Sequence, residues 1–406
     1  MKIYISGISG TGMGPLGLMA KAAGISVCGS DKNPGAILPE LTGAGIEVKI
    51  GEQDGKFLQE KIDEGIDWFV HTSALPEDHP ELVLAREKGL KISKRDELTE
   101  YLVKELGLKM VAVAGTHGKT TTTSMITFAS LKLGLPVSYI VGTTLGFAPS
   151  GSYHEGDKFF IYEADEYDRN FLMFHPWLAV LVSVSYDHPD IYPTREEYTE
   201  AFEQFKSQSE KVIESTEEGA EFKLAGEPRR RDAAVAMKAV HEMAPEVELS
   251  RIKEILDEFP GVGRRFERLA DGIYSDYAHH PEEIAATIDV AKDEAKLRDK
   301  KGIVVVYQPH QNTRQHEVKD EYKDAFKGAD KLYWLPTYLT RENPELKIYT
   351  PEDLISVLSN LEIAEPAELN DDLKEKILKY QEDGFLVLLM TAGPADGWLR
   401  EIIKNS

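Results

Sequence analysis

The sequence predicts an α/β protein with mostly parallel sheets, divided into three domains. Short apolar strands alternate with segments of helical period in the first third of the chain. A further apolar strand, at residues 111–114, is followed by a turn that contains glycine, lysine and threonine, and then by a helix. Strands alternate with helices again from residue 272. From these changes of pattern we place the domains at residues 1–107, 108–262 and 263–406.

Composition and charge exclude several classes of protein. The 406 residues, of which 42% are hydrophobic, suffice for roughly two to four domains with a core of their own. A net charge of −23 without a long basic run argues against nucleic-acid binding. The single cysteine, Cys28, excludes an intrachain disulfide and suits a reducing cytosol. The first residues lead directly into a strand and no stretch could span a bilayer, so we expect a cytoplasmic protein without a membrane partner.

Four strands in the first domain, at residues 2–6, 26–28, 47–50 and 68–71, predict a Rossmann-like sheet. The first strand leads into a glycine-rich turn at residues 7–17, and Asp31 follows the second. The turn's backbone amides can hold a diphosphate and Asp31 can accept a hydrogen bond from a ribose. The literal dinucleotide fingerprint begins only at Gly12, well after the strand, and contains Pro15. We therefore favour a nucleotide-diphosphate site over an NAD site, with a purely structural turn as the alternative.

The central domain begins with a phosphate-loop motif, as in P-loop ATPases. Its buried strand runs into Gly115-Thr116-His117-Gly118-Lys119-Thr120-Thr121, and a helix is predicted from about residue 120 to 133. The two glycines let successive N–H groups converge on an anion at the helix N-terminus. Lys119 would then meet the β- and γ-phosphates of ATP, and Thr120 a Mg²⁺ ion. Only two residues separate the glycines, where the usual loop has four, and a turn that uses glycine only for tight geometry is the alternative.

Acidic residues follow the next predicted strand, at residues 159–162. Four carboxylates lie within residues 163–168, and such clusters are often solvated. At a strand end in a phosphate-loop domain, however, carboxylate oxygens such as that of Glu163 are typical ligands of Mg²⁺. A strand predicted at residues 178–184 leads to His188, a second candidate ligand where the chain leaves the sheet, with a structural histidine as the alternative.

The remaining elements are predicted from period and turn residues. We expect a charged helix over residues 91–108 and a second helix from residue 196 to about 212. Two more helices are expected after three arginines at residues 229–231, and the simplest interpretation of these arginines is a solvent-exposed face. In the third, Rossmann-like domain, strands are predicted at residues 273–276, 303–307, 331–335 and 385–390. Pro281 marks a helix start, because its missing N–H costs nothing there.

Several motifs occur in the order seen in Mur ligases, and the chain resembles that family over its whole length. They are residues 115–121, 163–166, 187–188, 261–266 and 276–281. The resemblance implies an ATP- and Mg²⁺-dependent ligase of peptidoglycan precursor synthesis, in which a carboxylate becomes an acyl phosphate that an amine converts to an amide. Residues 276–281 and 308–314 are most similar to members that join L-alanine to UDP-N-acetylmuramate. Residues 166–168 are slightly closer to members that attach a ready-made tripeptide instead.

The resemblance also implies which residues bind each substrate. For the UDP part these are Gly10, Thr11, Gly12, Ser30, Asp31, Thr72 and Ser73. For ATP they are Gly115, Thr116, His117, Gly118, Lys119, Thr120, Thr121, Asp232 and Asp276. The implied metal ligands are Thr120, Glu163 and His188. The implied catalytic residues are Lys119, Glu163, His188 and Arg265, and those on the amino-acid side are His310 and Arg314. We expect a monomer or a weak homodimer.

Some positions depart from the family pattern. Ser183 stands where the family has an asparagine, and Arg229 and Asp232 replace an asparagine pair that reads adenine. Asp232 can accept a hydrogen bond from the adenine amino group but cannot donate one to a ring nitrogen. No lysine is in register with the carbamylated lysine of several members, and we hypothesise that Glu203 supplies that carboxylate. A nucleotide-binding relative without ligase activity and an unrelated phosphate-loop kinase remain as alternatives.

Overall fold

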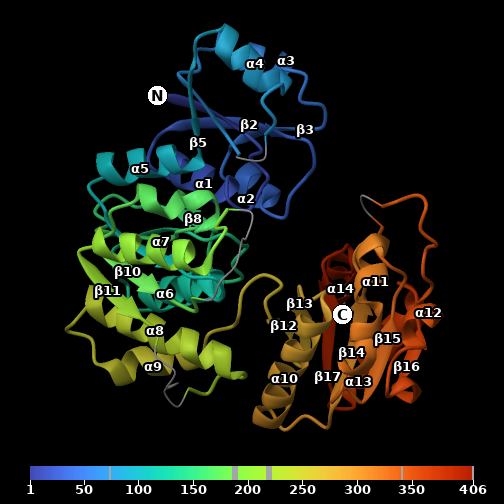
Figure 1. Ribbon diagram of the computed structural model, residues 1–406. Helices are drawn as coiled ribbons and strands as arrows, with labels where there is room; N and C mark the ends of the chain where they lie inside the picture. Colours follow the sequence, from blue (N-terminus) through green and yellow to red (C-terminus); the bar gives the residue numbers. More distant parts are fainter. Residues whose placement is uncertain (73–74, 185–190, 216–221, 340–341, 405–406) are drawn as a thin grey trace. The chain divides into compact units, whose positions relative to one another are not determined.

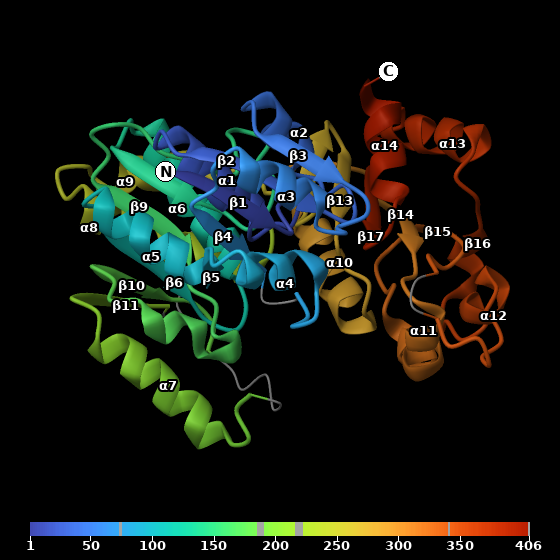
Figure 2. The same ribbon diagram turned by 90° about the horizontal axis from the view of Figure 1, so that it is seen from above.

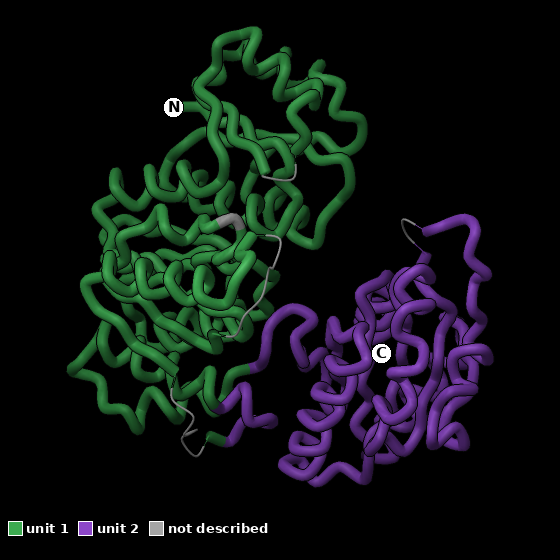
Figure 3. The backbone as a smooth tube through the Cα atoms, viewed as in Figure 1, with its two compact units in different colours: residues 1–222, 231–259 green, residues 223–230, 260–406 purple. Residues whose placement is uncertain are grey.

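The computed structural model describes residues 1–72, 75–184, 191–215, 222–339 and 342–404. Within these residues the chain forms three sheets flanked by helices (Figure 1). It divides into two compact units (Figure 3). Unit 1, residues 1–222 and 231–259, contains the first two sheets, and unit 2, residues 223–230 and 260–406, contains the third. The predicted α/β class with three mostly parallel sheets is confirmed.

The first sheet is parallel throughout, in the Rossmann-like order β3-β2-β1-β4-β5. Its strands are β1 (Lys2–Ser6), β2 (Ser26–Asp31), β3 (Glu47–Ile50), β4 (Trp68–His71) and β5 (Lys91–Lys94). Its helices are α1 (Gly14–Ala22), α2 (Leu38–Gly43), α3 (Lys56–Asp63), α4 (Pro80–Glu87) and α5 (Arg95–Glu105). Helices α3 and α4 pack on one face, and α1, α2 and α5 pack on the other. The carboxyl ends of β1 and β2 therefore carry the glycine-rich turn and Asp31.

The predicted helix over residues 91–108 is wrong at its start, because residues 91–94 form the edge strand β5. Lysines at both ends of this short strand suit an edge, where charged side chains stay in water. Ser93 points inward, and its hydroxyl accepts a hydrogen bond from the Trp68 indole N–H at 2.8 Å. The helix begins only at Arg95, directly at the carboxyl end of the strand.

The second sheet has the order β11-β10-β6-β9-β7-β8 and is parallel except for the β7–β8 pair. Its strands are β6 (Lys109–Ala114), β7 (Val137–Ile140), β8 (Gly151–Ser152), β9 (Phe159–Glu163), β10 (Leu178–Leu181) and β11 (Lys211–Glu214). Its helices are α6 (Lys119–Lys132), the 3₁₀ helix η1 (Tyr167–Met173), α7 (Arg195–Ser207), α8 (Glu227–Met243) and α9 (Leu249–Asp257). Helix α7 lies on one face of the sheet (Figure 2), where its aromatic residues join the core. Helix α6, with α9 against it, covers the other face.

Two predicted boundaries in this domain are wrong. The helix predicted to reach residue 212 ends at Ser207, and residues 211–214 form β11, parallel to β10. The Gln208 side chain explains the stop, because its Nε2 donates to the carbonyls of Leu172 and Phe174 and ties the chain to the end of η1. The strand predicted over residues 178–184 ends at Leu181.

The third sheet has the order β12-β13-β17-β14-β15-β16, with only the β12–β13 pair antiparallel. Its strands are β12 (Glu267–Ala270), β13 (Ile273–Asp276), β14 (Ile303–Gln308), β15 (Lys331–Trp334), β16 (Ala364–Pro366) and β17 (Leu386–Thr391). Its helices are α10 (Pro281–Leu297), α11 (Asn312–Val318), η2 (Lys319–Asp324), α12 (Pro351–Ile355), η3 (Leu361–Ile363), α13 (Asp371–Glu382) and α14 (Ala395–Lys404). Helices α10 and α12 cover one face, and α13 and α14 cover the other. Pro281 begins α10, as predicted.

The two domains of unit 1 share a continuous core across the contact between α1 and β8. A Cβ atom on Gly151 of β8 would lie 2.0 Å from the carbonyl oxygen of Pro15 in α1, so the close approach requires glycine. Beside it, the backbone N–H and the hydroxyl of Ser150 donate to the Glu40 carboxylate at 2.7 and 2.9 Å. This junction holds the glycine-rich turn and the phosphate loop in one compact unit.

Among the helices that the structure describes, none has the length and apolar character needed to cross a membrane.

We expect Gly151→Ala to lower the free energy of unfolding by about 1–3 kcal/mol, because the added methyl group forces α1 away from β8. Gly146→Ala is the matched control, since a Cβ atom there meets nothing within 4 Å. Chemical denaturation of both variants checks this prediction. Equal stability of the two variants would show that the junction accommodates a side chain.

Candidate active site

The phosphate loop connects β6 to α6 and requires both of its glycines. Gly115 has φ +142°, and a Cβ atom there would lie 2.6 Å from a methyl carbon of Val182. Gly118 has φ +88°, and a Cβ atom there would lie 2.6 Å from the Asp232 carboxylate. The Thr116 N–H donates to the Ser183 carbonyl at 2.6 Å, which anchors the loop to the chain after β10. The loop is therefore narrow, and its shape depends on residues without a side chain.

Lys119 is held by the loop and by a buried carboxylate. Its Nζ donates to the Gly115 carbonyl at 2.5 Å and to Glu166 Oε2 at 2.7 Å. The Glu166 side chain is only 1% exposed, and burial raises its pKa although Lys119 acts in the opposite direction. The Tyr192 hydroxyl donates to the Glu166 backbone carbonyl at 2.6 Å. The sequence suggested a role for Lys119 and for residues 163–168, which we call the acidic segment, but did not show that Lys119 pairs with Glu166.

Thr120 and Glu163, two of the predicted metal ligands, lie side by side. The Thr120 hydroxyl donates to Glu163 Oε2 at 3.0 Å, and the Gly142 N–H donates to Oε1 at 3.0 Å. Burial raises the pKa of the Glu163 carboxyl. A hydroxyl and a carboxylate are hard oxygen donors, so this pair fits Mg²⁺. The third predicted ligand, His188, lies outside the described residues, and within those described no group of three His, Cys, Asp or Glu side chains is placed to hold a metal.

The other residues predicted to bind ATP lie in the phosphate loop or next to it. His117 is exposed and forms an isolated bridge with Ser183, while the Thr116 hydroxyl lies 2.7 Å from that of Tyr198. Thr121 is half-buried in the first turn of α6. The Asp232 carboxylate lies against Gly118 of the loop.

In the first sheet the glycine-rich turn is braced by Asp31, which accepts the Ser9 N–H at 2.9 Å and the Asn33 N–H at 3.2 Å. Gly12 packs against a side chain that the sequence did not suggest: a Cβ atom on Gly12 would lie 2.9 Å from Nη1 of Arg95. A cavity of about 280 Å³ opens at this point, which we call the Gly12 cavity. It is lined by Gly7, Gly10, Thr11, Gly12, Met13, Thr72, Lys94, Arg95, Asp96, Asp165, Tyr167 and Asn170.

Ser30 was predicted to bind the UDP part, but its side chain is buried and donates to the Glu81 carboxylate at 2.7 Å. Glu81 also accepts hydrogen bonds from the hydroxyls of Tyr4 at 2.5 Å and Ser6 at 2.6 Å, and from the Gln53 amide at 3.2 Å. This network stiffens the carboxyl ends of β1 and β2 beneath the glycine-rich turn. Its members are far apart in sequence, so no local pattern could reveal it. Ser73, also predicted, lies outside the described residues.

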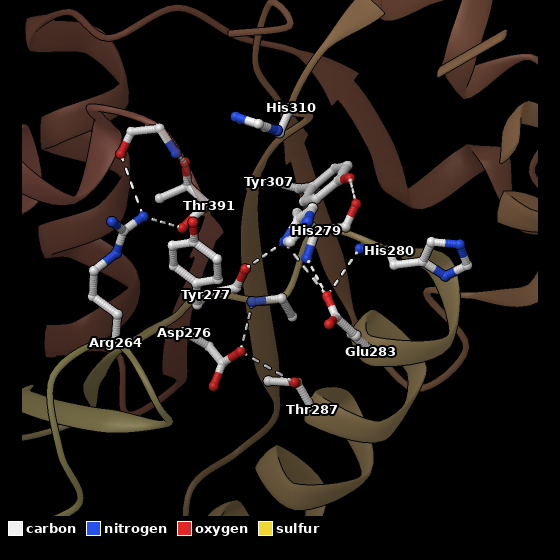
Figure 4. A network of polar contacts seen from close by, with 12 residues as sticks. Arg264, Asp276, Tyr277, His279, His280, Glu283, Thr287, Tyr307, His310 and Thr391 are labelled. Atoms are coloured by element: carbon white, nitrogen blue, oxygen red, sulfur yellow. Dashed lines mark hydrogen bonds and ion pairs between the residues drawn. The ribbon is translucent and has the colours of Figure 1, made fainter. Parts of the chain in front are cut away.

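In unit 2, Asp276 ends β13 and is buried (Figure 4). Its carboxylate accepts the N–H groups of Phe266 at 2.6 Å and Ala278 at 2.8 Å, and burial raises its pKa. The predicted catalytic Arg265 is exposed and lies over the Tyr277 ring at 5.6 Å. Its neighbour Arg264 is the anchored arginine, because it donates to the Thr391 carbonyl and lies 4.7 Å from the same ring.

The predicted amino-acid residues lie at the carboxyl end of β14. The His310 ring lies 5.6 Å from that of His279 and 5.8 Å from that of Tyr338. Burial, reinforced by His279 and by the positive charge of Arg314, lowers the pKa of His310, so that its imidazole is neutral at pH 7. Its buried Nδ1 has no hydrogen-bond partner among the described residues. A polar ligand at this edge of the sheet would satisfy that atom.

Three family models match successive parts of the chain: the Mur ligase family catalytic domain over residues 2–105, the Mur ligase middle domain over 113–227, and the Mur ligase glutamate ligase domain over 264–393. The UDP-N-acetylmuramate--L-alanine ligase of Symbiobacterium thermophilum is 31% identical, over 97% of this chain and 90% of that protein.

Two solved structures show the same fold. The UDP-N-acetylmuramate-alanine ligase of Thermotoga maritima matches with a TM-score of 0.80 and 23% identity, over 100% of this chain and 99% of that chain. A murein peptide ligase of Psychrobacter arcticus matches with a TM-score of 0.59 and 22% identity, over 100% and 98%. With its three parts matched in order, the chain belongs to the Mur ligase family of ATP-dependent ligases.

Proposed function

We propose that the protein joins L-alanine to the carboxylate of UDP-N-acetylmuramate at the expense of ATP, in peptidoglycan precursor synthesis. One observation carries the proposal: the segment from Glu163 to Asn170 borders two sites at once. Glu163 and Glu166 contact Thr120 and Lys119 of the phosphate loop. Asp165, Tyr167 and Asn170 line the Gly12 cavity. A UDP substrate bound in the cavity and the terminal phosphate of ATP at Lys119 would therefore lie on either side of one short segment.

The residues of the phosphate loop fit the chemistry of carboxylate activation. Residues 115–121 would cradle the phosphates of ATP, with Asp232 on the adenine side, and Thr120, Glu163 and His188 would hold Mg²⁺. When bound, the metal supplies positive charge that offsets the charge of the transferred phosphoryl group. Lys119 offsets more of that charge and aligns the terminal phosphate with the carboxylate. The phosphorylated carboxylate is then open to attack by an amine, and no side chain need act as a nucleophile.

We divide the substrates among three domains, at residues 1–107, 108–262 and 263–406. The first would bind the UDP part through Gly10, Thr11, Gly12, Asp31, Thr72 and Ser73, with Ser30 acting from beneath the turn through the Glu81 network. In the third, His310 and Arg314 would bind the amine substrate, while Arg265 would act in catalysis and Asp276 on the nucleotide. The buried Nδ1 of His310, which has no hydrogen-bond partner among the described residues, supports the assignment of His310. We propose a monomer or a weak homodimer.

An activity that attaches a ready-made tripeptide to the same nucleotide is the second candidate. It is favoured by the run Glu166-Tyr167-Asp168 and by the murein peptide ligase of Psychrobacter arcticus, which shares the fold. The higher TM-score of the Thermotoga maritima structure and the names of the curated relatives favour L-alanine.

Phosphate release by the purified protein with ATP and Mg²⁺ tests the choice of amine. We expect release only when UDP-N-acetylmuramate and L-alanine are both present. Release that depends on the tripeptide instead would select the second candidate. No release with either amine, together with tight binding of the UDP substrate, would indicate a relative that has lost ligase activity.

We expect Lys119→Ala to reduce turnover at least about a hundredfold, because the charge that aligns and neutralises the terminal phosphate is lost. Binding of UDP-N-acetylmuramate should stay nearly unchanged, since the predicted UDP site lies in the first domain and contacts of Thr120, Gly142 and Tyr192 still hold residues 163–166. Lys132→Ala, at the exposed C-terminal end of the same helix, should leave both properties unchanged. Calorimetric titration and phosphate release check the three proteins, and loss of UDP-substrate binding in Lys119→Ala would contradict this division of sites.

We expect Glu163→Gln to raise the Mg²⁺ concentration for half-maximal turnover about tenfold or more, because a neutral amide is a poorer ligand than a carboxylate. Glu203→Gln is the comparison. The Glu203 side chain is 62% exposed and forms an ion pair with Lys206 at 2.5 Å, so we expect an unchanged Mg²⁺ dependence. A shift in Glu203→Gln as large as that in Glu163→Gln would support the hypothesis that Glu203 replaces the carbamylated lysine.

A further inference from the structure

Arg95 is a cation at the Gly12 cavity for which the mechanism above has no use. It is the first residue of α5, at the carboxyl end of β5, and its side chain is 26% exposed. Its Nε donates to Asp96 Oδ1 at 3.1 Å. Its four terminal N–H groups donate to no residue in the described part of the chain, although a guanidinium has five donors in total. The side chain is thus tethered at one nitrogen and available at the other two.

A buried network fixes the direction of this guanidinium. Asp96 is 5% exposed, and the same Oδ1 atom accepts the Tyr162 hydroxyl at 2.9 Å. Burial raises the pKa of Tyr162, so that the hydroxyl remains a donor. Tyr162 lies on β9, in the strand that leads to the acidic segment. The orientation of Arg95 is therefore set before a ligand binds, which reduces the entropy that binding costs.

Backbone donors of the glycine-rich turn lie beside Arg95 in the lining of the cavity. Within the glycine-rich turn, the N–H groups of Gly7 and Ile8 donate to the Ser30 carbonyl, that of Ser9 donates to the Asp31 carboxylate, and that of Gly10 donates to the Gly7 carbonyl. Those of Thr11 and Gly12 donate to no described residue, and α1 begins two residues later. Two free amides before a helix N-terminus attract an anion. Nη1 of Arg95 lies 2.9 Å from the place of a Gly12 Cβ atom, so the guanidinium lies directly beside these amides.

We infer that Arg95 binds the diphosphate of the UDP substrate against the amides of Thr11 and Gly12, and thereby determines affinity for nucleoside diphosphates. This inference rests on the proposed function, because it assumes that a UDP-sugar enters the Gly12 cavity. A diphosphate fits well here, because its several oxygens can accept from two amides and a two-pronged guanidinium together.

Calorimetric titration of UDP and of UDP-N-acetylmuramate into Arg95→Met, Arg95→Lys and the native protein tests the inference. We expect Arg95→Met to weaken both ligands by a similar factor, about 10- to 100-fold, as for a lost charge-assisted hydrogen-bonding group. Arg95→Lys keeps the charge but not the two-pronged geometry, and should lose less. Arg86→Met is the matched control, because Arg86 lies on α4 in the same domain, pairs with Glu77 and does not line the cavity.

The outcomes separate the possible failures. A loss confined to UDP-N-acetylmuramate would place Arg95 at the carboxylate and overturn the inference, as would unchanged affinity in Arg95→Met. Native protein that binds neither nucleotide would instead overturn the proposed function. ATP affinity and the melting temperature of each variant show whether the unit remains folded. Asp96 retains its hydrogen bond from Tyr162 in Arg95→Met, so we expect the ATP affinity and the melting temperature of this variant to be close to native values.

Discussion

The ion pair between Lys119 and Glu166 is the interaction on which the arrangement of unit 1 depends. The two side chains are 18% and 1% exposed, so separating them without a new partner would leave a poorly solvated charge. Lys119 begins α6 and Glu166 follows β9, and the pair therefore holds the start of the helix against the end of the neighbouring strand. The phosphate loop is kept in shape by the protein itself, and a nucleotide phosphate is a natural second partner for the lysine.

This pair also fixes the direction of the acidic segment. Glu163 and Glu166 turn toward the phosphate loop, while Asp165, Tyr167 and Asn170 line the Gly12 cavity. The junction of α1 with β8, closed by Gly151 and Ser150, keeps the two domains of unit 1 at this spacing. In phosphoryl transfer, the main contributions of the protein are to align the two substrates and to stabilise charge. A small number of buried contacts thus converts two ordinary α/β domains into a site that can activate a carboxylate.

In unit 2, a turn at residues 264–266 with positive φ values positions two arginines. Arg264 and Phe266 have φ values of +55° and +49°, which are costly for residues with side chains. Asp276 compensates by accepting the Phe266 N–H, and Arg264 is held by the carbonyl of Thr391. The strained turn therefore leaves one arginine anchored and presents the next, Arg265, to solvent.

The amino-acid sequence alone determined the α/β class, the shortened phosphate loop and the order of the family motifs. These features depend on local chemistry: strand period, the position of glycines, and a lysine and threonine at a helix start. The edge strand β5 escaped prediction, because its lysines and short length resemble the helix that follows. Tertiary structure alone decided that Lys119 pairs with Glu166, that Ser30 serves the buried Glu81 network, and that Arg95 faces Gly12. Each of these contacts joins residues 47 to 83 positions apart, and only the packing of strands and helices brings such residues together.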